Sequence, residues 1–147
     1  MEYRQRNDKL VLGALEKCDL PELGIFNLVM RVDTGAATSS LHVENVEEYE
    51  KNDESWINFD IHPDVYDVEI LTRHSCKVEA KRRVKSSTAT RERRFVIETL
   101  LVIGDQSWPI KMTLTDRSEM TYMMLLGREA MSERVLVDPS KEFLVTA

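Results

Sequence analysis

Apolar and polar positions alternate along most of the chain, a pattern that predicts β-strands. Over residues 25–32 the even-numbered residues from Phe26 to Val32 are apolar and are expected on one face, with Asn27 and Arg31 on the other. Similar patterns predict strands at residues 9–15, 41–50, 55–61, 68–84, 92–102, 108–115, 123–126, 135–137 and 143–145. Residues 128–134 form the one segment with a helical pattern. The class is therefore mostly β, with a short helix near the C-terminal end.

Two turns organise the middle of the chain. The predicted strands 68–84 and 92–102 flank the polar segment 85–91, which indicates a hairpin tip. Gly104 and Asp105 then form a turn into the strand at 108–115.

Size and composition are typical of a single globular domain covering residues 1–147. The chain is 42% hydrophobic and 31% charged. No run of eighteen apolar residues is present, so no membrane span is expected. The first residues lack the apolar segment of a secretory signal, which predicts a cytoplasmic protein. A signal peptide trimmed earlier is the alternative left open.

Cysteine and histidine are scarce. Cys18 and Cys76 are too few for a disulfide framework and are expected as free thiols in a reducing compartment. His42, His62 and His74 are scattered, and no His-Glu-x-x-His motif occurs. His74 and Cys76 share a strand face, but a tight zinc site normally needs three or four ligands. No metal is expected.

The charge is unevenly distributed. Residues 73–94 contain nine basic residues against Glu79 and Glu92, although the whole chain has a net charge of −6. Such a segment is either a solvated face or a surface that recognises an anionic partner. Nucleic acid is disfavoured as that partner, because the rest of the chain is strongly acidic and repels phosphates.

Asp33-Thr34-Gly35 follows the apolar strand 25–32 and carries the candidate chemistry. Aspartic peptidases place two carboxylates around one water. Because the two groups are too close for both to ionise, they share a proton, so one acts as base and the other as acid. Gly35 has no Cβ and lets two such loops approach closely, and the Thr34 hydroxyl can tie one loop to the other. No cofactor is needed.

The chain contains one Asp-Thr-Gly, so the second aspartate must come from another copy of the chain. A twofold axis beside Asp33 meets this requirement with a single interface. The sequence therefore predicts a homodimer.

The segment 32–36 together with Leu125-Leu126-Gly127-Arg128 resembles the retropepsin superfamily. Residues 31–42 and 114–130 are more closely similar to the bacterial family known as ATP-dependent zinc proteases. The resemblance implies a closed β-barrel of the retropepsin (acid protease) type with a short C-terminal helix. It also implies an aspartic peptidase with Asp33, Thr34 and Gly35 as catalytic residues, and with Ala36, Gly127 and Arg128 as structural residues near the site.

The family's name is not reflected in these residues. The sequence has no Gly-x-x-x-x-Gly-Lys-Ser/Thr loop for ATP and no zinc motif.

In retropepsins a hairpin flap closes over the two aspartates, and the order along the chain places the flap here at residues 81–95. We expect its arginines, with Arg117, to bind an acidic or glutamate-rich peptide tail as substrate: Arg82, Arg83, Arg91, Arg94 and Arg117. A charged hairpin in solvent is the equal alternative. The flap tip lacks the glycines of retroviral flaps, and Glu129 stands where retroviral enzymes usually have Asp or Asn.

Two other functions remain open at this point. One is a non-catalytic peptide-binding or dimerisation domain with the same fold. The other is a metal-dependent hydrolase, as the family's name says.

Overall fold

The structure of the chain is a computed structural model that describes residues 5–6, 8–62, 70–85, 91–116 and 121–145, with the backbone alone at residues 5–6, 83–85 and 91–93. Its described elements are β1 (Gln5–Arg6), β2 (Lys9–Leu12), β3 (Leu15–Leu20), the 3-10 helix η1 (Pro21–Leu23), β4 (Ile25–Val32), β5 (Ser39–His42), β6 (Glu44–Lys51), β7 (Glu54–Ile61), β8 (Thr72–Lys77), β9 (Ala80–Lys85), β10 (Arg91–Ile103), β11 (Gln106–Thr115), β12 (Met124–Leu126), α1 (Arg128–Met131) and β13 (Val135–Val137). The mostly β class and the short helix are confirmed.

Six strands close into a barrel. The sheet runs in the order β11, β5, β12, β4, β3 and β10, and β10 pairs again with β11 to complete the ring. Strand β9 extends the sheet beyond β10. Closure removes the free sheet edges that otherwise expose unpaired backbone groups.

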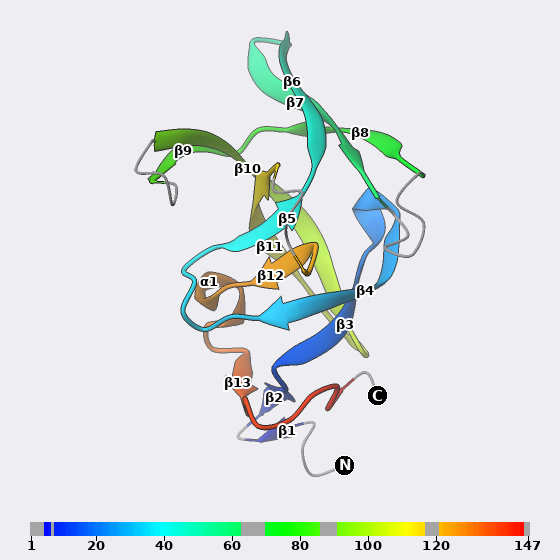
Figure 1. The fold of residues 1–147 in the computed structure, drawn as a ribbon, viewed down its shortest axis with the longest axis vertical. Coiled ribbons are helices and arrows are strands. Elements are labelled where there is room, and N and C mark those ends of the chain that lie inside the picture. Colours follow the sequence, from blue (N-terminus) through cyan, green and yellow to red (C-terminus); the bar gives the residue numbers. More distant parts are fainter. Residues whose placement is uncertain (1–4, 7, 63–69, 86–90, 117–120, 146–147) are drawn as a thin grey trace.

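Two other parts attach to the barrel (Figure 1). Strands β6, β7 and β8 form a separate antiparallel sheet at the top of the view, with the β6–β7 turn at Asn52 and Asp53 in left-handed backbone conformations. Strands β1, β2 and β13 form a small sheet near both termini. No helix in the described part of the chain is long and apolar enough to cross a membrane.

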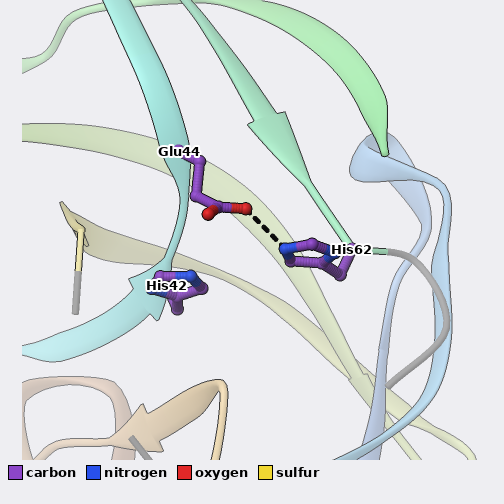
Figure 2. Close-up of side chains that lie close together, drawn as sticks. All are labelled: His42, Glu44 and His62. Atoms are coloured by element: carbon purple, nitrogen blue, oxygen red, sulfur yellow. Dashed lines mark hydrogen bonds and ion pairs between the residues drawn. The ribbon is translucent and has the colours of Figure 1, made fainter. Parts of the chain in front are cut away.

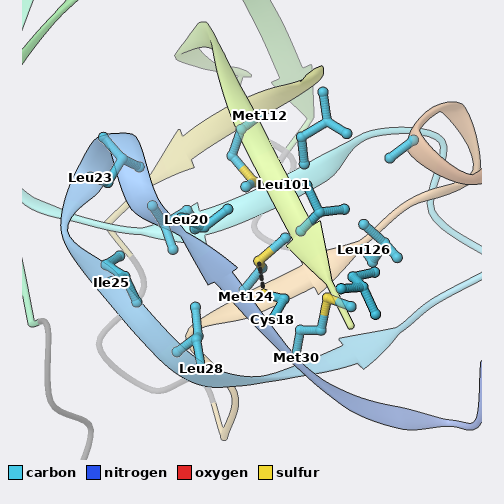
Figure 3. Close-up of a cluster of buried hydrophobic side chains, with 14 of the residues drawn as sticks. Cys18, Leu20, Leu23, Ile25, Leu28, Met30, Leu101, Met112, Met124 and Leu126 are labelled. Atoms are coloured by element: carbon cyan, nitrogen blue, oxygen red, sulfur yellow. Dashed lines mark hydrogen bonds between the residues drawn. The ribbon is translucent and has the colours of Figure 1, made fainter. Parts of the chain in front are cut away.

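The barrel encloses one hydrophobic core, part of which is drawn in Figure 3. Met30 and Leu126, from neighbouring strands, have no exposed surface. The thiol of Cys18 lies in this core and donates to the sulfur of Met124 at 3.7 Å. Burial raises the pKa of Cys18 to about 12, so this thiol is not a nucleophile. Both cysteines are free, as expected.

The predicted alternation of β4 is wrong at its start, although its bounds are confirmed. Phe26 is 57% exposed, whereas Ile25 is buried. The cause is an extra residue in β4: Leu20 pairs with Ile25 and Cys18 with Leu28, a register shift that reverses the faces. Asn27 takes a φ of 56° at this point, and its backbone N–H donates to Asp19 Oδ1 at 2.8 Å.

Other strand predictions differ in their bounds. The segment predicted as one strand over 9–15 is divided between β2 and β3, and the predicted strand 68–84 between β8 and β9. The second division falls at Val78 and Glu79, where the chain passes from one sheet to the other. The N–H of Val78 donates to the carbonyl of Ser55 in β7, and the N–H of Glu79 donates to the carbonyl of Val96 in the barrel strand β10. The helix is shorter than predicted, at four residues.

The predicted strand at 143–145 is wrong, because a buried carboxylate holds this segment instead. Glu16 on β3 has no exposed surface and accepts hydrogen bonds from the backbone N–H groups of Gly13, Leu144 and Val145, at 2.8, 2.9 and 3.3 Å. These N–H groups are consequently satisfied without a strand partner.

Replacing Glu16 should therefore destabilise the whole barrel. Glu16→Gln keeps the shape but replaces one accepting oxygen by an N–H donor, so we expect a loss of about 2 kcal/mol in unfolding free energy. Chemical denaturation measures this loss. Glu142→Gln, an exposed carboxylate in the same region, should change the unfolding free energy by less than about 0.5 kcal/mol. Equal stability of the two variants would contradict the anchoring role of Glu16.

Candidate active site

The loop with Asp33-Thr34-Gly35 joins β4 to β5, and β12 lies between these two strands. Leu126 pairs with Val32 in parallel, and Leu125 pairs with Ser40 in antiparallel register. The late strand β12 thus lies between β4, which leads into the loop, and β5, which follows it. The Leu125-Leu126-Gly127-Arg128 segment is therefore held directly against the aspartate loop.

Backbone hydrogen bonds fix this contact on both sides. The N–H of Asp33 donates to the carbonyl of Leu126 at 2.9 Å, and the N–H of Arg128 donates to the carbonyl of Ala36 at 2.8 Å. The guanidinium of Arg128 also donates to the carbonyl of Thr34 at 3.0 Å. The loop is thereby tied at Asp33 to the end of β12, and at Thr34 and Ala36 to Arg128 at the start of α1.

Gly127 permits the closest approach in the site. A Cβ at this position would lie 2.5 Å from the backbone carbon of Thr38 and 2.7 Å from its oxygen. The N–H of Gly127 donates to the side-chain oxygen of Ser39 at 3.0 Å. No larger residue fits here without moving the loop.

The three motif residues lie at the surface of the chain. Thr34 and Gly35 are exposed and Asp33 is half-buried. The carboxylate Oδ1 of Asp33 accepts the N–H of Gly35 at 2.9 Å. Among the described residues, a Cβ at Gly35 would approach only that same oxygen, at 3.2 Å. In the described part of the chain no second loop lies against Gly35, so the close approach of two loops stays a prediction.

The hairpin of β9 and β10 reaches the same loop. Arg82 is 39% exposed in its side chain, and its guanidinium donates to Thr38 Oγ1 at 3.3 Å and lies 4.0 Å from Glu129 Oε1. Figure 1 shows β9 on the side of the barrel where the β4–β5 loop lies. Arg94 pairs opposite Arg82 across the hairpin, so both side chains point to the same face.

The structure describes less of the other predicted substrate-binding arginines. In the alternation of faces along β9 and β10, Arg83 and Arg91 occupy positions of the opposite face from Arg82 and Arg94. Arg117 lies outside the described residues, as does the predicted flap tip at 86–90.

A second group of polar side chains gathers away from Asp33, where the barrel meets the sheet of β6, β7 and β8. His42 ends β5, Glu44 begins β6 and His62 directly follows β7 (Figure 2). Their potential ligand atoms all lie within 4.8 Å of one another. His42 and His62 are scattered in the sequence, which predicts no metal site. The spacing of His42 and Glu44, two residues apart in an extended segment, was the available signal.

The closed barrel, with β12 between β4 and β5, is a retropepsin-like fold. The chain belongs to the RimB-like family, described as retropepsin-like aspartic endopeptidase RimB, which matches residues 11–147.

Two curated relatives have a different name. A probable alpha-L-glutamate ligase of Parasynechococcus marenigrum is 47% identical over 131 residues, or 89% of this chain and 28% of that protein. Another from Shewanella pealeana is 42% identical over 137 residues, or 93% of this chain and 30% of that protein. The chain thus spans less than a third of these relatives.

A solved structure shares the fold. A Legionella pneumophila protein of unknown function superposes with a TM-score of 0.74 at 28% identity, over 92% of this chain and 97% of that one.

The contact at Gly127 should be sensitive to a single methyl group. Gly127→Ala places a carbon against the Thr38 backbone, and we expect it to lower the unfolding free energy by about 2 kcal/mol. Thermal or urea unfolding measures the change. Glu129→Ala, an exposed position two residues later, should cost less than about 0.5 kcal/mol. A Gly127→Ala protein as stable as Glu129→Ala would contradict the close contact.

Proposed function

We propose that the chain is one subunit of a homodimeric aspartic endopeptidase that hydrolyses peptide bonds in acidic, glutamate-rich segments. The observation that carries the proposal is the Asp33-Thr34-Gly35 loop, which is hydrogen-bonded to Leu126 and Arg128 and leaves Thr34 and Gly35 exposed. A rigid loop with an outward carboxylate is what a twofold site requires, because each subunit supplies half of the dyad.

In such a dimer the two Asp33 carboxylates share one proton and hold a water between them. The ionised carboxylate takes a proton from the water as the oxygen attacks the peptide carbonyl carbon. The protonated carboxylate donates its proton to the carbonyl oxygen. The carboxyl that took the proton from water then passes it to the nitrogen, and the other carboxylate takes a proton from one hydroxyl of the diol. The C–N bond breaks, the amine leaves, and the two carboxyl groups again share one proton. No cofactor takes part.

The basic hairpin supports an acidic substrate. Arg82 and Arg94 share a face, and Arg82 reaches the loop that follows the aspartate. Arginine binds carboxylates through paired N–H donors. The relatives named as glutamate ligases contain a segment like this chain within much longer proteins. A peptidase domain beside an enzyme that adds glutamate has glutamate-rich products at hand, and we propose these as the substrate class. The free thiols fit a reducing, cytoplasmic location.

Loss of the Asp33 carboxylate tests the chemistry. Asp33→Asn keeps the shape of the side chain and an acceptor for the Gly35 N–H, so folding and dimerisation should be unchanged. Cleavage of an oligoglutamate peptide should fall at least about 100-fold. Mass spectrometry of the products and analytical ultracentrifugation measure the two properties. The exposed Asp105→Asn is the control and should cleave like the wild type. A wild-type chain that dimerises and binds but cleaves none of these peptides indicates the non-catalytic binding domain instead.

Mixing the two proteins tests whether one site needs two chains. After subunit exchange in an equal mixture of wild type and Asp33→Asn, about one quarter of the dimers contain two aspartates. Activity should then be about one quarter of that of wild type at the same total concentration. A value of about one half indicates that each chain works alone.

Charge reversal on the hairpin tests the substrate class. Changing Arg82, Arg91 and Arg94 to Glu should reduce kcat/KM for glutamate-rich peptides by about tenfold or more, which corresponds to about 1.4 kcal/mol. Cleavage of neutral peptides should change much less, because they lack the charge that the arginines recognise. Lys111→Glu on β11 is the matched reversal outside the hairpin. An unchanged ratio of acidic to neutral cleavage excludes this role of the arginines.

A further inference from the structure

The junction between the barrel and the sheet of β6, β7 and β8 carries three metal-binding side chains from three strand ends. Figure 2 shows His42, Glu44 and His62 pointing toward one another across this junction. His62 Nε2 lies 2.5 Å from Glu44 Oε2. The rings of His42 and His62 are nearly parallel, with centroids 6.2 Å apart.

Burial makes this arrangement more than a surface cluster. His42 is 6% exposed as a residue, and the side chains of His62 and Glu44 are 11% and 31% exposed. His62 Nδ1 is buried and has no hydrogen-bond partner in the described part of the chain. A buried polar atom without a partner costs about 1–3 kcal/mol, and such atoms are rare in folded proteins. Within the described residues, His62 Nδ1 is therefore without the partner that a buried polar atom normally has.

The geometry points to a zinc-class divalent metal site formed by His42, Glu44 and His62. Two imidazoles with one carboxylate are a ligand set that Zn²⁺ and related transition metals prefer, whereas Mg²⁺ and Ca²⁺ prefer oxygen ligands alone. Three protein ligands leave one tetrahedral position for water. Ligand atoms on one tetrahedral zinc lie about 3.4 Å apart. His62 Nε2 and Glu44 Oε2 would therefore separate from their 2.5 Å contact, while the more distant ligand atoms would close inward from at most 4.8 Å.

The metal would connect the barrel strand β5 to both strands of the β6–β7 hairpin, at the point where Val43 alone separates β5 from β6. His42 ends the barrel strand that begins next to the Asp33 loop, while Glu44 and His62 lie at the bases of the two strands of the β6–β7 hairpin. Binding at this point fixes the hairpin to the barrel wall. The role is structural, since the site lies at the opposite end of β5 from Ser39, which contacts Gly127.

Metal titration of the full chain tests the site. After chelator treatment and dialysis, calorimetry with ZnCl₂ should give one ion per chain with a dissociation constant of about 1 μM or lower. CoCl₂ should give the visible absorption of a cobalt ion with nitrogen and oxygen ligands. The melting temperature should rise with free metal, because the ion binds only the folded chain.

Three variants locate the ion. His62→Ala and the isosteric Glu44→Gln should each weaken zinc binding at least about tenfold. His74→Ala removes a histidine on β8 that shares its strand face with Cys76, and it should bind zinc like the wild type. Because Glu44→Gln preserves the size and one oxygen of the side chain, it keeps the test valid if His62→Ala fails to fold.

Three outcomes would contradict the proposed metal site. The site is excluded if the chain binds less than one equivalent of zinc at a free zinc concentration about 100 times the expected dissociation constant of about 1 μM. Unchanged zinc binding in Glu44→Gln and His62→Ala also excludes it. Loss of binding in His74→Ala places the ion on β8 instead and also overturns the inference. The readout is metal binding, so its failure is separate from any failure of the peptidase proposal.

Discussion

The close approach of Gly127 to the backbone of Thr38 is the contact on which the candidate site depends. It allows β12 to lie between β4 and β5, with its end against the loop that carries Asp33. Without that insertion the loop would be held only at its two ends. With it, the loop is hydrogen-bonded through Asp33, Thr34 and Ala36 to a separate part of the chain. The rigidity of the Asp33 loop therefore depends on a glycine about ninety residues later in the sequence, since only a residue without a Cβ fits against the Thr38 backbone.

Much of this site could be predicted from the sequence. The bounds of β4 follow from its apolar residues, and both glycine-containing motifs are short and recognisable. Their contact in space could be inferred only through resemblance to retropepsins, because no local pattern links Leu126 to Val32. The partner subunit and the substrate stay predictions, since a single chain contains one aspartate loop.

The errors have specific physical causes. Phe26 was assigned to the wrong face because a bulge at Asn27 changes the alternation without any change in hydrophobicity. The segment 143–145 has apolar residues typical of a strand, but Glu16 satisfies its N–H groups from the side. His42 and His62 lie twenty residues apart in sequence, and only the pairing of β6 with β7 brings them together. In each case a long-range contact overrides a local pattern.

Strand β10 is part of both the β9–β10 hairpin and the barrel. Its first residues pair with β9 and its later residues with β11, and Val96 pairs with both Ala80 and Thr113. Val96 is fully buried. The β9–β10 hairpin is therefore continuous with the barrel wall through β10 and is not an independent unit. A substitution at Val96 would therefore disturb the pairing of β10 with the hairpin strand β9 and with the barrel strand β11 at the same time.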